Sequence, residues 1–162
     1  MGMAGFGIDI PSRSAILYTS SGSSTPFITT TIAQAGRGTA AVLLLPQAGI
    51  AAHANKLVFF SSFSVTQRDL LDSVQRVTGT SDTDWHIETK NVEERTAEGW
   101  KRLKEGNPMG MVDLLYASVM TKGVGDQFRV GTENEALGLP KENLDDVVKE
   151  VVENLEKKGK GE

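Results

Sequence analysis

Residues 56–79 read KLVFFSSFSVTQRDLLDSVQRVTG and place an apolar segment directly before an amphipathic one. Lys56–Phe63 is rich in apolar and aromatic residues and does not alternate with polar ones, which predicts a strand buried on both faces. Ser64 and Gln67 then have the spacing of a capping box, and apolar residues recur at helical intervals up to Gly79, a C-terminal helix stop. A buried strand followed by a helix predicts a mixed α/β chain.

Similar patterns occur on both sides of this stretch. Gly7–Ile10 and Ala15–Tyr18 are short β-type runs around a Pro-Ser-Arg-Ser turn, which predicts a hairpin. The other expected elements are a helix capped by Thr29–Thr31 that ends at Pro46, a surface loop over Pro46–Asn55, a strand at Trp85–Thr89, helices opened by Asn91 and covering Met111–Val119, and a last helix after Pro140. Gly36 and Gly38 weaken the first helix unless another group packs closely against its backbone.

Three of these helices have an apolar face that we expect to turn toward the core. The faces are Val92, Thr96, Trp100 and Leu103; then Met111, Leu115 and Val119 with Val112 and Tyr116; then Leu144, Val147, Val148, Val151, Val152 and Leu155. The fold class is therefore α/β, in the form of an α+β-like fragment.

The chain has 162 residues, a size typical of one domain, and a formal net charge of −4. This acidic balance argues against nucleic acid as a partner. Residues 1–64 contain only Asp9, Arg13, Arg37 and Lys56 as charged residues. So few charges predict that this third lies inside a larger assembly or presents an apolar surface to a partner, although a small Ser/Thr/Gly-rich solvated face is the alternative.

The chain has no cysteine, and its longest apolar run is six residues, Ala40–Leu45. A disulfide framework and a thiolate zinc site are excluded, and a membrane-spanning helix, which needs about 20 apolar residues, is not expected. We expect a cytoplasmic protein.

The sequence offers no catalytic or metal-binding constellation. Gly2-x-x-Gly5-x-Gly7 is a poor dinucleotide fingerprint because no strand precedes it and a proline follows it. Neither tyrosine is followed four residues later by lysine, and no Gly-x-Ser-x-Gly or Ser-x-x-Lys occurs. His53 and His86 are the only histidines, and a solvated strand-end position suits His86 better than a metal site does. We therefore predict no catalytic and no metal-binding residue.

Several ordered blocks nevertheless resemble the C-terminal, substrate-binding part of NmrA-like and isoflavone-reductase-like proteins of the fungal type, which are atypical short-chain dehydrogenases. The blocks are GFGIDIPSRSAILY, TPFITTTIAQAGRGTAAVLLLP, ANKLVFFSSFSVTQRDLLDSVQRVTG, DWHIE, GMVDLLYASV and ENEALGLPKENLDDVV. The resemblance covers about Gly5 to Glu153, nearly the whole chain.

The resemblance implies an NAD(P)-binding Rossmann-type protein whose glycine fingerprint and catalytic lysine would lie before Met1. Residues 1–156 would be the substrate-binding lobe and 157–162 a frayed tail. Lys56–Ser62 would be a late strand of the Rossmann sheet, and the low-charge third would face the absent lobe. No cofactor is expected in this chain alone, whereas the parent family uses NAD(P)H.

The same resemblance places the substrate cleft between the two lobes. The residues expected to border it are Phe6, Gly7, Phe27, Thr29 and Thr30. The alternative for Phe6 and Phe27 is that they fill a small hydrophobic core.

Three functions follow as hypotheses. The first is a substrate-binding lobe of an NAD(P)H-dependent oxidoreductase that does not transfer hydride alone; its partners would be a small-molecule substrate and a Rossmann lobe, with no nucleic acid and no membrane. The second is a non-catalytic interaction or regulatory protein that binds a partner, or itself, through its low-charge third. The third is an unrelated small-ligand carrier.

Overall fold

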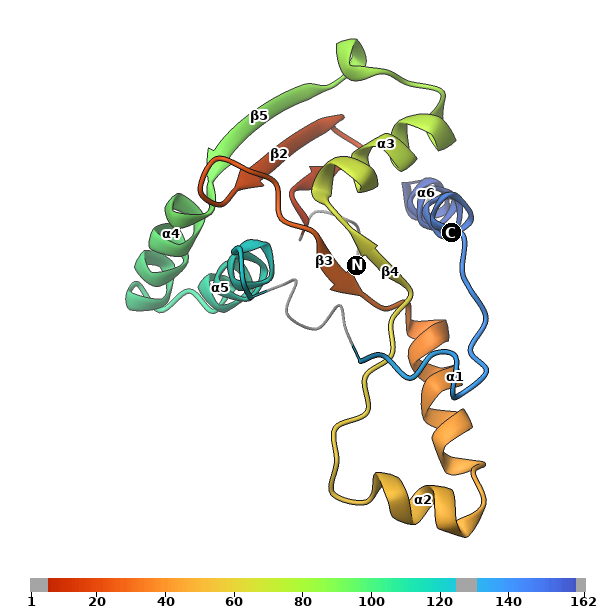
Figure 1. Ribbon diagram of the computed structural model, residues 1–162. Helices are drawn as coiled ribbons and strands as arrows, with labels where there is room; N and C mark the ends of the chain where they lie inside the picture. Colours follow the sequence, from red (N-terminus) through yellow and green to blue (C-terminus); the bar gives the residue numbers. More distant parts are fainter. Residues whose placement is uncertain (1–5, 125–130, 160–162) are drawn as a thin grey trace.

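The computed structural model describes residues 6–124 and 131–159 and shows two small sheets surrounded by helices (Figure 1). Gly2 and Gly5 of the glycine-rich motif and the end of the Gly123–Gly125 loop lie outside the described residues. The elements are β1 (Ile8–Asp9), β2 (Ser14–Thr19), β3 (Phe27–Thr29), α1 (Ile32–Leu43), α2 (Gln47–His53), β4 (Phe63–Val65), α3 (Gln67–Thr78), the 3-10 turn η2 (Asp82–Asp84), β5 (His86–Asn91), α4 (Val92–Lys104), α5 (Met109–Met120) and α6 (Leu144–Gly159). The fold is mixed α/β, as predicted.

The first sheet has the strand order β1-β2-β5. β1 pairs antiparallel with β2, which confirms the predicted hairpin, and β2 pairs parallel with β5 along its whole length. A parallel pair needs a long crossover connection, and here that connection includes α3, which packs against β2. The strand predicted at Trp85–Thr89 is thus confirmed; it begins one residue later and ends two residues later than expected.

The second sheet pairs β3 with β4 and corrects the prediction for Lys56–Phe63. Only Phe63–Val65 is a strand, and the residues before it take no regular secondary structure. Leu57 is 81% exposed, so a strand buried on both faces, and with it the late Rossmann strand that the resemblance implied, is wrong for this segment. Two residues of this segment bond instead to residues 133 and 134: the Glu133 amide donates to the Phe59 carbonyl, and the Asn134 side chain pairs with the Ser61 backbone. The Phe60 carbonyl accepts from the Thr30 hydroxyl.

The helix predicted after this segment is confirmed, but its cap lies two residues further along. Ser64 belongs to β4, so Thr66 takes the N-cap position: its hydroxyl accepts from the Asp69 amide at 3.1 Å, and the Asp69 carboxylate accepts from the Thr66 amide at 2.8 Å. Gly79 ends the helix in the left-handed region, as expected, at φ 65°.

The helix expected after the three threonines is also confirmed, with Thr31 as its N-cap. It ends at Leu43, and the stretch from Pro46 begins a second short helix, α2, where a loop was expected. Proline is favoured at helix starts because its missing N–H would have no partner there. Close packing accounts for the glycine at position 38 of α1, since a Cβ there would lie 2.8 Å from the Phe60 ring.

The main core lies between the first sheet, α3 and α6. Its fully buried members include Ile8, Phe27, Leu71 and Val74, and Val148 of α6 packs against them. The expected apolar face of α6 is therefore directed inward, and the helix continues to Gly159.

The expected apolar faces of α4 and α5 are corrected in part. The two helices contact each other through Gly99 and Gly110, where a Cβ on Gly110 would lie 2.3 Å from the Gly99 carbonyl oxygen. This close approach directs other residues outward, so Trp100 is 55% exposed and Met111 and Leu115 are each 61% exposed. Helical periodicity identifies residues that share a face, but it does not say which face the rest of the fold covers.

Candidate functional site

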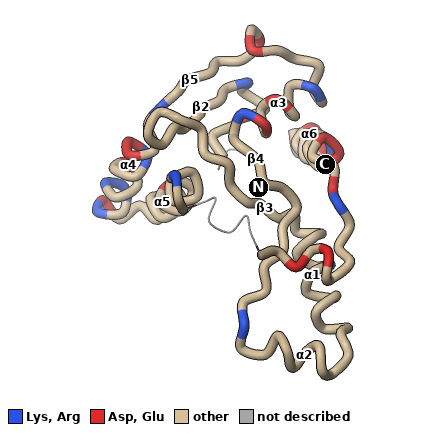
Figure 2. The backbone as a smooth tube through the Cα atoms, viewed as in Figure 1, with Lys and Arg blue, Asp and Glu red and all other residues tan. Residues whose placement is uncertain are grey.

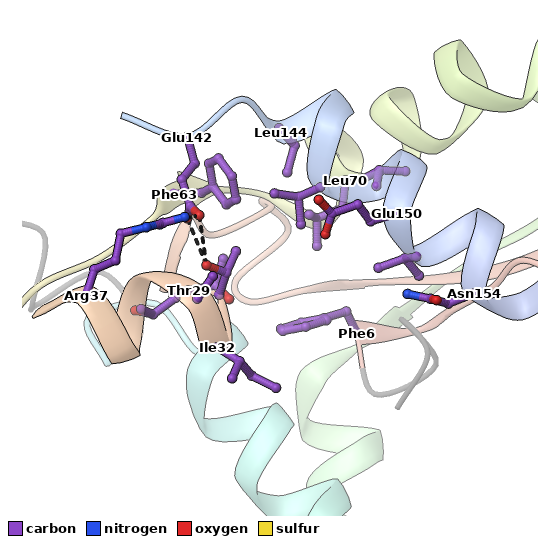
Figure 3. A pocket seen from close by; sticks show the side chains of 16 residues that line it. Phe6, Thr29, Ile32, Arg37, Phe63, Leu70, Glu142, Leu144, Glu150 and Asn154 are labelled. Carbon is purple, nitrogen blue, oxygen red and sulfur yellow. Dashed lines mark hydrogen bonds and ion pairs between the residues drawn. The ribbon is translucent and has the colours of Figure 1, made fainter. Parts of the chain in front are cut away.

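A cavity of about 560 Å³ opens between α1, the β3–β4 pair and α6 (Figure 3). The residues that line it are Phe6, Thr29, Thr30, Thr31, Ile32, Ala33, Arg37, Phe63, Leu70, Glu142, Leu144, Val147, Val148, Glu150, Val151 and Asn154. Arg37 and Glu142 lie together at one end, and apolar side chains cover most of the wall. This volume is in the range of small-molecule sites, which are apolar with a few placed polar groups.

The polar end is built around the Glu142 carboxylate. The Thr31 hydroxyl donates to it at 2.9 Å, the Ser62 hydroxyl donates to it as well, and Arg37 Nη1 lies 3.0 Å from Oε1. The Glu142 side chain is only 11% exposed. Burial by itself would raise its pKa, but the hydrogen bonds from Ser62, Arg37 and Thr31 outweigh burial and hold the pKa below its usual value. Glu142 is therefore an anion at neutral pH and accepts hydrogen bonds.

Glu142 also supplies a charge that α1 lacks. The first turn of α1 contains no acidic residue. Its N-cap, Thr31, accepts from the Gln34 amide and donates to Glu142, which places the carboxylate at the positive end of the helix. A residue more than a hundred positions away thus completes the N-terminus of α1.

Gln34 fixes this arrangement from below. Gln34 is fully buried. Its side-chain nitrogen Nε2 donates to the Pro140 carbonyl at 2.9 Å, and its side-chain oxygen Oε1 accepts from Arg37 Nη1 at 2.7 Å. Gln34 therefore holds both the segment that carries Glu142 and the guanidinium that pairs with it.

The apolar wall comes from α6 and from the sheet side. α6 is anchored to α3 by Asp145, which accepts from Ser73 at 2.6 Å and from Arg76 at 2.7 Å. The hydrogen bonds from Arg76 and Ser73 lower the pKa of Asp145 to about 2. With this anchor in place, Val147 and Val151 face the cavity.

The predicted site residues are only partly brought together at this cavity. Phe6, Thr29 and Thr30 line it. Phe27 is fully buried and does not line it; its ring stacks on Phe6 with centroids 5.2 Å apart. Gly7 also lies outside the lining, in a turn at φ 82° where a Cβ would lie 2.3 Å from the Ile16 carbonyl oxygen.

Most of the polar lining was not predicted from the sequence. Arg37, Glu142, Glu150 and Asn154 had no motif or spacing that marked them as site residues. The α6 side of the wall did have a signal, because its apolar face was visible as a helical pattern, but the pattern did not say that part of this face borders a cavity.

A cation–aromatic layer continues from Phe6 away from the cavity. Phe6 meets Tyr116 edge-on at 5.0 Å, and the Arg95 guanidinium lies over the rings of Tyr18 and Tyr116 at 4.9 and 5.4 Å. Arg95 is only 6% exposed. Burial raises the pKa of Tyr18, so its phenol stays protonated at neutral pH. The layer supports Phe6 through packing.

Gly7 does not have the surroundings of a dinucleotide-binding turn. Gly7 leads into a strand that pairs antiparallel, whereas a phosphate-binding turn leads into a helix. The N-termini of α1, α3, α4 and α6 all have a carboxylate beside or within them: Glu142, Asp69, Glu93 and Asp145 respectively. These carboxylates occupy the positions where the helix dipole would attract a phosphate.

Within residues 6–124 and 131–159, no group of three or more His, Asp or Glu side chains is placed to hold a metal ion. No helix in this part of the chain has the length and apolar character needed to cross a bilayer. A second cavity of about 520 Å³ lies at the other end of α6, between Trp85, Val152 and Arg13. It contains fewer apolar groups and no polar cluster like that of Glu142.

The comparisons with known proteins support a redox family. The chain is 28% identical over 151 residues to the oxidoreductase poxI of Penicillium oxalicum, an alignment that covers 91% of this chain and 45% of poxI. It is 26% identical over 125 residues to the oxidoreductase aprR of Aspergillus flavus, covering 76% of this chain and 40% of aprR. No protein-family model and no solved structure matches. The chain spans less than half the length of these curated relatives and is related to fungal proteins named as oxidoreductases.

Proposed function

We propose that this chain is the substrate-binding part of an NAD(P)H-dependent oxidoreductase of the NmrA-like and isoflavone-reductase-like type, and that it does not transfer hydride by itself. The supporting observation is the cavity beside Phe6, which combines an apolar wall with one polar end. Two further observations agree with it: the relatives named as oxidoreductases, and the carboxylates at the N-termini of α1, α3, α4 and α6, which disfavour a phosphate at these four helix ends. Hydride chemistry would then need a cofactor held outside these 162 residues.

The charges of the cavity define the ligand class. Arg37 and Glu142 neutralise each other, and Glu150 adds a negative charge at the wall. The threonine hydroxyls offer short-range hydrogen bonds beside Glu142. An uncharged apolar molecule with one hydroxyl suits this lining better than an anion does, because a buried anion would face the carboxylates.

The test uses the whole chain with two dyes, neutral Nile red and anionic anilinonaphthalene sulfonate. We expect Nile red to bind with the larger fluorescence gain, and Val147→Phe, which fills the cavity, to weaken that binding at least fivefold. Leu57→Ser is the control, since it changes an exposed apolar residue that does not line the cavity. Equal loss in both variants would contradict the cavity as the binding site.

The cofactor half of the proposal has its own test. A ligand that binds only the folded state must raise its stability. If the chain does not bind the cofactor, millimolar NADPH should therefore leave the thermal midpoint unchanged. The chain alone should not oxidise NADPH. A rise in the midpoint, or turnover without another protein, would overturn this half and leave the cavity proposal standing.

A second candidate function is partner binding through the low-charge third. The arm formed by α1 and α2 has few charged positions (Figure 2), and Lys56 is the only Lys, Arg, Asp or Glu between residues 38 and 58. Leu43 and Leu44 on this arm are 69% and 83% exposed. This candidate predicts that Leu44→Ser abolishes any self-association of the chain, measured by sedimentation.

A further inference from the structure

The α4–α5 pair presents three large apolar side chains on one side. Arg95 Nε of α4 lies 3.6 Å from Asp113 Oδ1 of α5. This ion pair is on the side of the two helices that faces Tyr18 of β2. At 100° per residue, Trp100 lies about 140° around α4 from Arg95, and Met111 and Leu115 lie about 160° around α5 from Asp113. The three residues therefore share the opposite side of the pair, which agrees with their exposures of 55%, 61% and 61%.

The charges on this side of α4 are ordered. Glu93, Ala97 and Lys104 are all exposed, and each lies within about 60° of Trp100 around the helix axis. The acidic residue precedes Trp100 and the basic residue follows it. The face thus reads Glu93, Ala97, Trp100, Lys104 along the helix.

This order is symmetric about the midpoint between residues 98 and 99. Glu93 lies as far before that point as Lys104 lies after it, and Ala97 and Trp100 are related in the same way. If two copies of α4 run antiparallel across a two-fold axis at that point, each Glu93 faces Lys104 of the second copy, about 8 Å along the helix from the axis. Each Trp100 then lies over Ala97 of the second copy, a large side chain against a small one.

We propose that this face, defined as Glu93, Ala97, Trp100, Lys104, Met111 and Leu115, binds a second copy of this chain through antiparallel α4 helices. An exposed tryptophan that shares one side of a helix pair with two exposed apolar side chains, with charged residues before and after it, has the usual composition of an interface centre. The acid-first, base-last order of α4 also suits the helix macrodipole. The macrodipole does not account for the apolar centre, and it does not require charges symmetric about that centre.

A charge swap separates the two explanations. In sedimentation velocity from micromolar to near-millimolar concentration we expect a reversible dimer. Glu93→Lys or Lys104→Glu alone should raise the dimer dissociation constant about tenfold, because each puts like charges opposite one another twice per dimer. The double variant E93K/K104E should return to within about threefold of the unmodified chain, although its charges then oppose the macrodipole, since the pairs are re-formed in reverse.

Two substitutions test the centre. Trp100→Ala should raise the dissociation constant more than either single charge reversal, whereas Leu44→Ser, at the residue that follows α1, should leave it unchanged. Thermal melts of every variant verify that the fold is kept, which we expect because all these positions are exposed. A monomer at all concentrations would overturn the proposal. So would a double variant as weak as the single ones, or a dimer that Leu44→Ser disrupts, which would assign association to the α1–α2 arm.

Discussion

Glu142→Gln tests whether one buried carboxylate joins α6, α1 and the β4 side of the cavity. The substitution keeps the shape of the side chain and removes its charge. Two hydroxyl hydrogen bonds, from Thr31 and Ser62, and the ion pair with Arg37 depend on that charge. A neutral hydrogen bond contributes about 1 kcal/mol to stability, and one to a charged group contributes roughly twice as much. Removing the charge should therefore cost about 1 kcal/mol for each hydroxyl, or about 2 kcal/mol for the two.

The assay is urea unfolding followed by circular dichroism at pH 7. With a denaturant dependence of about 2 kcal/mol per molar urea, a loss of about 2 kcal/mol lowers the midpoint by about 1 M. Glu150→Gln is the control, because Glu150 is an exposed glutamate at the same cavity. It should change the midpoint by less than about 0.25 M, since surface substitutions stay within about 0.5 kcal/mol.

The lowered pKa of Glu142 predicts how the stability difference between the two chains changes with pH. The folded pKa of Glu142 is lower than the usual 4.5. A carboxylate of this kind contributes stability that is fully present above the unfolded pKa and is lost as the pH falls through the folded pKa. The difference in urea midpoint between the unmodified chain and Glu142→Gln should therefore be largest at pH 7 and should decrease below about pH 4.5. A loss of stability no larger than that of Glu150→Gln, or one that grows in acid, would contradict this role of the Glu142 carboxylate.

Four further substitutions test other contacts. Gly7→Ala should cost about 3 kcal/mol in urea unfolding and Gly22→Ala about 1 kcal/mol, because both have positive φ but only Gly7 would place a Cβ against a β2 carbonyl. Asp145→Asn should lower the thermal midpoint at neutral pH; that difference should disappear as the pH falls from 3.8 toward about 2, the folded pKa. The His53 ring donates to the Glu133 carboxylate and to a backbone carbonyl, which raises its pKa above 6.5. Glu133→Gln should lower that pKa in an NMR titration, and an unchanged pKa would contradict the contact.

Local signals predicted most helices correctly. The capping threonines, the apolar repeat of α3 and the glycine after it are contained within one stretch of chain, as are the acidic first turn and apolar face of α6. Each acts over one or two turns, so no distant residue is needed to read it.

The predictions that were wrong concern segments whose conformation or burial depends on contacts with residues far away in the sequence. Phe59 and Phe60 have the composition of a strand, but their segment meets Glu133 on one side and Gly38 of α1 on the other, and no strand pairs with it before Phe63. Trp100 belongs to an apolar pattern, but the Gly99–Gly110 contact decides which side of α4 is covered.

The site divides in the same way. Phe6, Thr29 and Thr30 were expected at a ligand site from a family resemblance, and they do line the cavity. Arg37 and Glu142 had no signal, because an ion pair between residues 105 positions apart exists only when the fold brings them together.

Neighbouring residues and composition were enough to predict the mixed α/β class, the threonine cap of α1, the apolar faces of α3 and α6, and the low charge of the first third. That Glu142 completes the N-terminus of α1, that α6 forms a wall of the cavity and that Trp100 faces outward became visible only in the packed fold. The physical reason is that burial, ion pairing and close backbone packing are properties of two surfaces in contact, and the sequence of either surface alone does not specify the other.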